Sequence, residues 1–296
     1  MTLHPEIQKI VEQIPPASTT PPNPADMRAF EAGNVPPVEE RLPITSVEDT
    51  TLADVPVRIY TDTEETKGTI VYFHGGAFFS GSLDTHDHVA RALAKETGGR
   101  VVSVGYSLSP EVAYPVALHE CYAVVREVAT QLADAAPLAV AGDSSGGNFV
   151  AAVTAMAHDD GFDRITHQIL YYPSVDLDFD QARWPSLSEN AEGYGLEYNG
   201  LAPFNSFYLE GGADPADPLV SPIKRADLSG LPKALVVTAG YDPLRDEGEA
   251  YAEKLSEAGV ETQLKRYDAA NHGFVVNFSW IPEFYEVFHD TARFLN

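Results

Sequence analysis

From residue 69 onward, short apolar runs alternate with longer stretches that have the spacing of one helix face. The runs lie at 69–73, 101–106, 138–141, 168–172, 234–238 and 262–266, and the helical stretches at 89–96, 117–132, 147–157, 247–258 and 282–294. Strands rich in Val and Ile that are separated by helices predict a mostly parallel sheet with helices on both faces. The sequence therefore predicts one doubly wound α/β domain, which two paired strands at 44–50 and 55–60 precede.

Two regions depart from this alternation. Residues 1–45 contain helical patterns at 6–14 and 25–32, separated by a proline-rich stretch. Residues 174–222 are rich in aromatic residues, glycine and proline. Because ligands of open α/β sheets bind beyond the carboxyl ends of the strands, we expect both regions to form a small helical cap over that edge. Residues 46–296 would then form the catalytic domain, with the second region inserted in it.

The composition limits the partners of the chain. Acidic residues outnumber basic ones by 44 to 19, and the net charge of −25 has the sign of nucleic acid, so we expect no nucleic-acid partner. No stretch approaches the roughly 18 consecutive apolar residues of a membrane-spanning helix. The N-terminus lacks the pattern of a secretory signal, and we expect a cytoplasmic protein without membrane contact. Cys121 is the only cysteine, which excludes an internal disulfide. Assembly into a homodimer is compatible with the sequence.

Residues 142–146, Gly-Asp-Ser-Ser-Gly, match the Gly-x-Ser-x-Gly pattern of a serine nucleophile. They follow the predicted strand at 138–141 and begin the small-residue helix at 147–157. A turn this tight needs glycine, because a side chain would collide with the backbone. We therefore expect Ser144 to be a nucleophile at the carboxyl edge of the sheet, above the positive end of the helix. The alternative is an ordinary turn in which the serine caps the helix.

Residues 74–78, His-Gly-Gly-Ala-Phe, directly follow the predicted strand at 69–73. Two glycines allow backbone N–H groups to converge on one point, which is the geometry of an oxyanion hole. The expected oxyanion-hole residues are Gly75, Gly76, Ala77 and Ser145. A phosphate-binding loop would need other glycine spacings, which are absent from the sequence. We expect His74 to brace this loop through a hydrogen bond.

The base and the acid of such a site follow the serine in the order Ser, acid, His. His272 lies in a loop after the last predicted strand and can reach back to Ser144. Asp242 lies at the carboxyl end of a predicted strand and is our preferred acid, with Asp246 and Asp268 as alternatives. The acid would fix the tautomer of the histidine and stabilise its charged form.

Together these motifs closely resemble the hormone-sensitive-lipase-like carboxylesterases, bacterial family IV of the α/β-hydrolase fold. The matching segments are 74–77, 142–148, 217–222, 242–246 and 272–274. The resemblance implies the triad Ser144, Asp242 and His272. It also implies hydrolysis of short- to medium-chain acyl esters through an acyl-enzyme, a helical cap and no cofactor. One segment departs from the family, because its D-Y-R-L-A-P-E reads G-Y-S-L-S-P-E at 105–111. The aspartate and the arginine of the family pattern are lost there, so we expect either the local packing or the pocket wall to differ from the family at this segment.

The remaining signals are weaker. Aromatic residues of the second cap region either line the substrate pocket or pack inside the cap, and they are Tyr194, Tyr198, Phe204, Phe207 and Tyr208. We take the first four as pocket candidates. We expect no metal site, because His-x-His at 86–88 is a weak pattern and the acidic segment 176–180 lacks the glycine and glutamate of a calcium loop. The alternative activity is that of an amidase or deacetylase, since the same triad serves both leaving groups. A non-catalytic small-molecule receptor on this scaffold is a third possibility.

Overall fold

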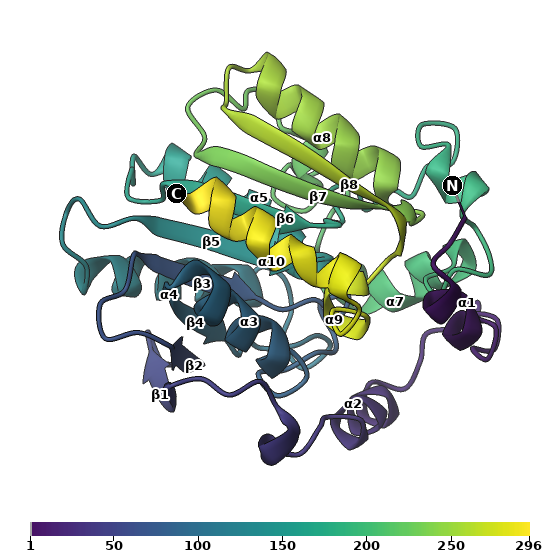
Figure 1. Cartoon of the computed structure of the whole chain (residues 1–296). Coiled ribbons are helices and arrows are strands. Elements are labelled where there is room, and N and C mark those ends of the chain that lie inside the picture. Colours follow the sequence, from purple (N-terminus) through teal and green to yellow (C-terminus); the bar gives the residue numbers. More distant parts are fainter. Residues whose placement is uncertain (1) are drawn as a thin grey trace.

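The computed structural model describes residues 2–296 and is built around an eight-stranded sheet in the order β1-β2-β4-β3-β5-β6-β7-β8 (Figure 1). The strands are β1 Ser46–Leu52, β2 Val55–Thr61, β3 Thr69–Phe73, β4 Arg100–Val104, β5 Leu138–Asp143, β6 His167–Tyr171, β7 Lys233–Tyr241 and β8 Thr262–Asn271. Strand β2 pairs antiparallel with both β1 and β4, and the other neighbours are parallel. The predicted sheet, mostly parallel with two paired strands leading into it, is confirmed.

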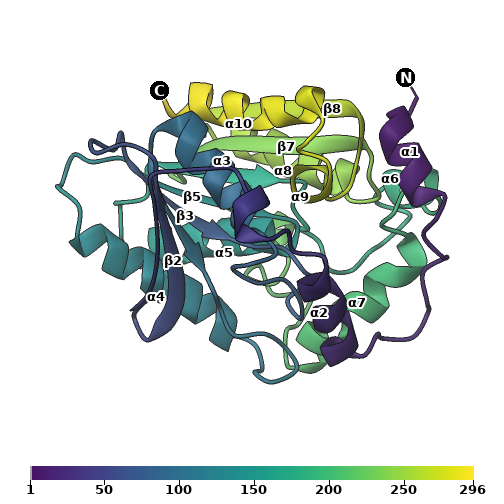
Figure 2. The same cartoon turned by 60° about the horizontal axis from the view of Figure 1, so that its bottom comes forward.

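Helices cover both faces of this sheet (Figure 2). One face carries α3 Asp87–Thr97 and α10 Pro282–Leu295, and the other carries α4 Val116–Thr130, α5 Ser145–Asp159 and α8 Arg245–Glu257. Helix α5 is buried along most of its length, because its Gly, Ala and Val side chains are small enough to let it pack closely on the strands. The doubly wound arrangement predicted from the sequence is confirmed.

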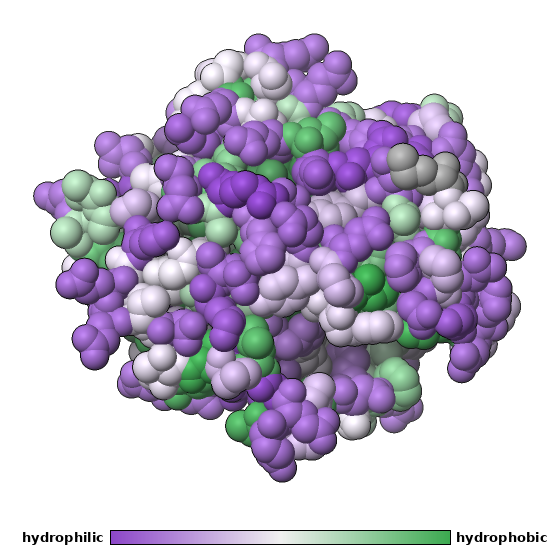
Figure 3. Space-filling model, in the orientation of Figure 1, coloured by the Kyte–Doolittle hydropathy of each residue, from purple (hydrophilic) through white to green (hydrophobic). Residues whose placement is uncertain are grey.

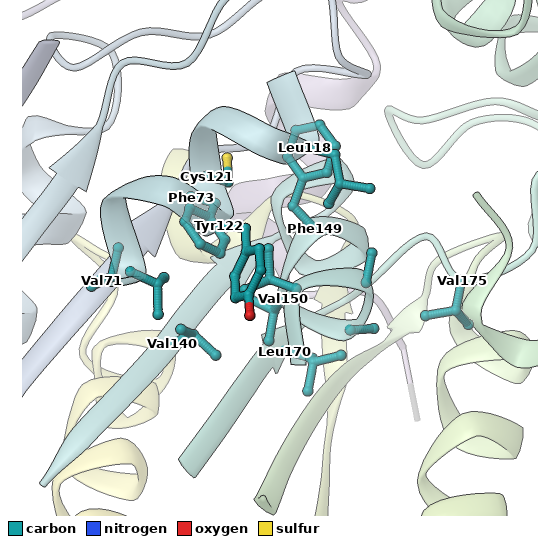
Figure 4. Close-up of a cluster of buried hydrophobic side chains, with 14 of the residues drawn as sticks. Val71, Phe73, Leu118, Cys121, Tyr122, Val140, Phe149, Val150, Leu170 and Val175 are labelled. Carbon is teal, nitrogen blue, oxygen red and sulfur yellow. The ribbon is translucent and has the colours of Figure 1, made fainter. Parts of the chain in front are cut away.

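Side chains of the strands and helices meet in two buried clusters, one on each face of the sheet. Figure 4 shows part of one cluster, formed by Val71, Phe73, Leu118, Cys121, Tyr122, Val140, Phe149, Val150, Leu170 and Val175. Burial raises the pKa of the Cys121 thiol well above its usual value, so the only cysteine packs as a small apolar residue.

Strands β7 and β8 extend further than the sequence predicted. The apolar patterns end at residues 238 and 266, whereas the strands continue to Tyr241 and Asn271. The two strands remain paired past an irregularity between Ala239 and Tyr241, although much of β8 is exposed. Backbone pairing therefore continues where side-chain alternation no longer marks a strand.

The two regions outside the alternating pattern contain short helices. The first holds α1 Pro5–Val11, α2 Pro24–Gly33 and the 3-10 helix η1 Val38–Glu40, and the second holds α6 Ser186–Glu189, α7 Tyr198–Glu210 and η2 Pro222–Lys224. A further short helix, α9 Phe274–Asn277, follows β8. Figures 1 and 2 both place α2 and α7 at the same end of the molecule. The cap boundaries, 1–45 and 174–222, stay a prediction. Among residues 2–296, no helix combines the length and apolar character that crossing a membrane requires.

Candidate active site

Three strand ends carry the predicted nucleophile, acid and base. Ser144 directly follows β5, Asp242 directly follows β7, and His272 directly follows β8. Strands β5 to β8 are consecutive neighbours in the sheet, so their carboxyl ends meet at one edge. Ser144 Oγ lies 2.9 Å from His272 Nε2, and His272 Nδ1 lies 2.8 Å from Asp242 Oδ2. The fold thus brings together three residues that are far apart in the chain.

Asp242 is held in one orientation by its surroundings. Its residue is 1% exposed, and its Oδ1 accepts the N–H of Leu244 at 2.8 Å. The side-chain amide of Asn190 donates to its backbone carbonyl at 3.0 Å. With Oδ1 occupied, Oδ2 remains to accept the Nδ1–H of His272. That bond leaves Nε2 of the ring as the acceptor for the serine hydroxyl.

The two alternative acids have other surroundings. Asp246 accepts the N–H of Ser186 at 2.7 Å and the Nε–H of Arg245 at 2.8 Å. Asp268 is exposed on β8. Neither makes a hydrogen bond to His272 in the described residues. Of the three candidates, Asp242 alone contacts the imidazole.

The turn at Ser144 has a strained backbone. Its φ of 54° and ψ of −117° lie where L-residues are rare, which costs about 1–3 kcal/mol. The N–H of Ser144 donates to the carbonyl of Tyr171 on β6 at 2.9 Å. A Cβ at Gly146 would come within 2.1 Å of the carbonyl oxygen of Phe73, so only glycine fits where α5 begins. These constraints lift the hydroxyl above the edge of the sheet.

The loop after β3 turns through three successive residues with positive φ: Gly76 at 123°, Ala77 at 48° and Phe78 at 64°. A Cβ at Gly76 would lie 2.2 Å from the carbonyl oxygen of Ser80. The N–H of Phe78 donates to Ser145 Oγ at 3.4 Å and so connects the loop to the turn at Ser144. Within residues 2–296, the N–H groups of Gly76, Ala77 and Ser145 have no acceptor. They are therefore available to a ligand oxygen.

Gly75 differs from the other three predicted oxyanion residues. Its N–H donates to Asp143 Oδ1 at 2.9 Å, so it is not available to an oxyanion, and the prediction that it is a donor is corrected. The hydroxyl of Tyr72 donates to the same oxygen, and His86 Nε2 lies 3.6 Å from Oδ2. Burial acts to raise the pKa of Asp143, but His86 and Tyr72 more than offset this and leave the pKa below its usual value. The buried carboxylate of Asp143, the residue before Ser144, therefore holds the loop at 74–78 against the turn at Ser144. We call this loop the oxyanion loop.

His74 braces the same loop, as the sequence predicted. Burial, together with the charge of His86, lowers the pKa of His74 to about 3, so the ring is neutral at ordinary pH. Its Nδ1–H donates to the carbonyl of Gly75 at 2.8 Å, and its own carbonyl accepts the hydroxyl of Tyr106 at 2.7 Å. A neutral ring held in this way orients the loop and cannot serve as a proton donor at ordinary pH.

A cavity of about 1310 Å³ opens onto Ser144, His272, Gly76 and Ala77. Its outer walls come from α2, α7, α9 and α10. Of the four predicted pocket aromatics, Phe204 lines this cavity. The cavity also exceeds the roughly 300–1,000 Å³ of common small-molecule sites.

The other three predicted pocket aromatics do not line the cavity, which corrects the prediction. The ring of Tyr194 packs 4.9 Å from that of Tyr241. The hydroxyl of Tyr198 donates to the carbonyl of Phe179 at 3.4 Å. Phe207 lies one turn after Phe204 on α7, and its ring packs 5.1 Å from that of Phe79. These rings are part of the packing around the cavity.

Sequence reasoning missed other cavity residues. Tyr172 directly follows β6, and its ring lies 4.8 Å from the ring of His272. Its position after a strand at the carboxyl edge is a signal that could have identified it. Phe30 of α2 and Trp280 after α9 also line the cavity. Their sequence contexts carry no comparable signal.

The segment at 105–111, which departs from the family pattern, is stabilised from two sides. The N–H and hydroxyl of Ser107 donate to Glu120 at 2.6 and 2.8 Å. Arg28 of α2 donates twice to Glu111, each at 2.8 Å, and to the carbonyl of Ser109 at 2.8 Å. Its Nε–H donates to the carbonyl of Phe79 at 2.7 Å. An arginine from the N-terminal region thus contacts the segment that lacks the family's arginine.

The residues considered for a metal site have other partners. Asp87 forms ion pairs with Arg91 at 2.6 Å and with Arg41 at 3.2 Å. His88 Nε2 lies 2.7 Å from the carbonyl of Val276. Across the described part of the chain, 2–296, no group of three or more His, Cys, Asp or Glu is placed to hold a metal ion.

Comparison with known proteins agrees with this geometry. The family described as "alpha/beta hydrolase fold" matches residues 70–276, and the chain belongs to this family. The resemblance to the hormone-sensitive-lipase-like branch is likewise confirmed. The chain is 39% identical to carboxylesterase NlhH of Mycobacterium tuberculosis over 257 residues, which cover 82% of this chain and 79% of that protein. It is also 39% identical to an arylesterase of Saccharolobus solfataricus over 75% of this chain and 73% of that protein.

A solved structure extends the likeness to the whole fold. The hyperthermophilic esterase of the archaeon Pyrobaculum calidifontis superposes with a TM-score of 0.90 at 36% sequence identity. The match covers 100% of this chain and 98% of that one. The α/β-hydrolase fold is therefore shown over the full chain.

Proposed function

We propose that this protein hydrolyses carboxylic esters through a covalent acyl-enzyme, with Ser144 as the nucleophile. The observation that carries the proposal is the pair of hydrogen bonds linking Ser144 to His272 and His272 to Asp242. They lie at one cavity with the available N–H groups of the oxyanion loop. The likeness to carboxylesterases and esterases supports the same reaction.

In the acylation half of the reaction, His272 Nε2 removes the proton of Ser144 as Oγ attacks the ester carbonyl carbon. Asp242 stabilises the imidazolium that forms. The N–H groups of Gly76, Ala77 and Ser145 are placed to donate to the negative oxygen of the tetrahedral intermediate. The imidazolium then gives its proton to the alcohol oxygen as the bond between carbon and that oxygen breaks. The alcohol leaves and the acyl group stays on Ser144.

In the deacylation half, water takes the place of the alcohol. His272 removes a proton from this water as its oxygen attacks the acyl carbon. The same N–H groups hold the second tetrahedral intermediate. Its collapse returns the proton to Ser144 and releases the carboxylic acid, so the enzyme is regenerated without a cofactor.

The test is hydrolysis of p-nitrophenyl acetate by the full chain and by Ser144→Ala. The variant is expected to lose about 10⁴-fold or more in kcat. Exposed Ser188 on α6 provides a matched control, because Ser188→Ala removes a hydroxyl outside the site. Retention of most turnover in Ser144→Ala would contradict the proposal. A higher kcat/KM for an anilide than for the matched ester would instead identify an amidase.

Four narrower statements belong to the same proposal. Short- to medium-chain acyl groups follow from the family likeness and are tested with a series of p-nitrophenyl esters from acetate to laurate. Exclusion of nucleic acid follows from the net charge of −25 and is tested by a mobility-shift assay. A homodimer and a cytoplasmic location are tested by sedimentation equilibrium and by cell fractionation.

A further inference from the structure

Two large aromatic side chains are exposed in the outer part of the active-site cavity. Phe30 is 71% exposed and Trp280 is 62% exposed, and both line the cavity. The other exposed large apolar residues of 2–296 are aliphatic and lie outside its lining: Ile10, Ile14, Val38, Val47, Val116 and Leu264. The face of the molecule in Figure 3 is mostly hydrophilic, with hydrophobic residues scattered over it. Exposed apolar side chains that share one cavity indicate a surface that a ligand covers.

The helix that carries Phe30 and the ring of Trp280 are both held in place without a ligand. Phe30 lies on α2, which Arg28 ties to the carbonyls of Phe79 and Ser109. The indole Nε1–H of Trp280 donates to the carbonyl of Asn277 at 3.1 Å. The indole donor is therefore satisfied within the protein, and the ring presents apolar surface to the cavity. A preformed wall of this kind costs little ordering on binding.

The charge of the cavity disfavours anionic ligands. Glu31 and Glu286 line it, whereas no Lys or Arg of residues 2–296 does. His289 lies between two carboxylates, with Nδ1 2.9 Å from Glu286 and Nε2 3.1 Å from Glu96. Its hydrogen bond to Glu286 raises its pKa, but both carboxylates already surround this charge. A ligand carboxylate or sulfonate would find no free cation here, because His289 and Arg293 are already paired with carboxylates.

The segment from His272 to Trp280 places Trp280 on the side of the cavity that receives the alcohol part of the ester. In the proposed reaction His272 protonates the leaving alcohol, so the alcohol part lies on the His272 side of the reacting carbon. The chain continues from His272 through α9 to Trp280, and Gly273, Val276 and Asn277 of this segment line the cavity. The wall that begins at the proton donor therefore leads to the exposed indole.

We propose that Trp280 and Phe30 bind the alcohol part of the substrate, and that the preferred substrates are esters of large, apolar alcohols that carry no negative charge. This proposal rests on the ester hydrolysis proposed above. It makes the two aromatic residues determinants of specificity, while the groups around Ser144 perform the chemistry.

The experiment compares kcat/KM for 2-naphthyl acetate and ethyl acetate in the wild-type chain, Trp280→Ala and Phe30→Ala. The ratio of the two values is expected to fall about 10-fold in each variant, the scale set by losing an apolar contact in a binding pocket. The ethyl group of ethyl acetate offers little apolar surface to an aromatic wall, so its kcat/KM should change less than about twofold. Dividing the ratio measured for each variant by the ratio measured for wild type removes the difference in leaving-group reactivity between the two esters.

Three controls sharpen the result. Trp280→Phe keeps an aromatic ring and should retain most of the ratio. Leu264→Ala removes another exposed apolar side chain, from β8 and outside the cavity lining, and should leave the ratio unchanged. Methyl 2-naphthylacetate carries the same rings on the acyl side, and its turnover relative to methyl acetate should not fall in Trp280→Ala. A sulfonated naphthyl acetate should be hydrolysed at least about 10-fold less efficiently by wild type than the neutral ester.

The outcomes separate the two proposals. If wild type hydrolyses ethyl acetate but neither alanine variant changes the ratio, the alcohol site is wrong and ester hydrolysis stands. A loss confined to the acyl-side naphthyl ester, or equal turnover of the sulfonated ester, also overturns the inference. If wild type hydrolyses none of these esters, ester hydrolysis itself fails.

Discussion

The strand ends that carry Ser144, Asp242 and His272 differ from α2 in how they are held. Asp242 is 1% exposed, and each of these residues follows a strand of the central sheet. Helix α2 has no buried residue. Hydrogen bonds attach it to the rest of the molecule, from Arg28 to the loops around Phe79 and Ser109 and from the N–H of Gly81 to Glu31 at 3.0 Å.

This difference separates two tasks of the molecule. Proton transfer and oxyanion binding depend on positions set by buried strands and close backbone packing, which tolerate little change. The part of the cavity wall that α2 supplies depends on surface hydrogen bonds, which typically contribute less. Substitutions in the strand ends should therefore act on kcat, and substitutions in α2 should act on KM for large substrates.

The largest effect is expected for Asp242→Asn, which keeps the shape of the side chain. Its amide would favour the wrong tautomer of His272, so kcat for p-nitrophenyl acetate should fall by about 10⁴-fold. Asp268→Asn changes an exposed acid that was a candidate on sequence grounds, and it should leave kcat unchanged. Equal losses of kcat in both variants would contradict the assignment of Asp242 as the acid that orients His272.

A smaller effect is expected for Gly76→Ala. The new Cβ would meet the carbonyl of Ser80 at 2.2 Å and move the oxyanion loop, so kcat should fall by about 10²–10³-fold with little change in KM. Gly212→Ala is the matched control, because Gly212 has a φ of 103° but no atom within 4 Å of its Cβ position. A similar loss of kcat in Gly212→Ala would contradict the view that displacement of the oxyanion loop causes the effect of Gly76→Ala.

His74, which is buried beside the strand ends, allows a test through the stability of the protein. Its pKa is about 3 in the folded protein against an ordinary value of 6.5, so between these pH values the unfolded chain binds more protons. The free energy of unfolding should therefore fall as pH decreases from 6.5 toward 3. In His74→Gln the number of protons taken up on unfolding should fall by up to one, so the free energy of unfolding should depend less on pH. Urea unfolding at pH 6.5, 5.5 and 4.5 measures this. An unchanged pH dependence in the variant would contradict the assignment.

The smallest effect is expected for Arg28→Ala. Loss of its hydrogen bonds to Phe79, Ser109 and Glu111 should raise KM for 2-naphthyl acetate by about 3- to 10-fold, with kcat nearly unchanged. Arg225→Ala removes a comparable surface ion pair, with Asp159, and should not affect KM. A fall in kcat as large as that of Gly76→Ala would mean that α2 also positions the chemistry.

Much of the fold and of the candidate site could be predicted from local patterns. The run at 69–73 coincides with β3, and the motif around Ser144 lies at the junction of β5 and α5, as predicted. The pocket residues were harder to predict. Helix α7 contains Pro203 and lacks a side-chain cap, so its pattern did not mark a helix, and the side of it that faces the cavity could not be deduced. Residue type alone does not distinguish Phe204 from Phe207.

By itself, the sequence determined the alternating architecture, the tight turn at Ser144 and the glycine-bearing loop after β3, because each depends on residues close together in the chain. Only the tertiary structure decided that Asp242 and not Asp246 meets His272, that the N–H of Gly75 is taken by Asp143, and that Phe30 shares a cavity with Trp280. These outcomes depend on distances between side chains from separate elements. Such distances are set by how the whole sheet and its helices pack.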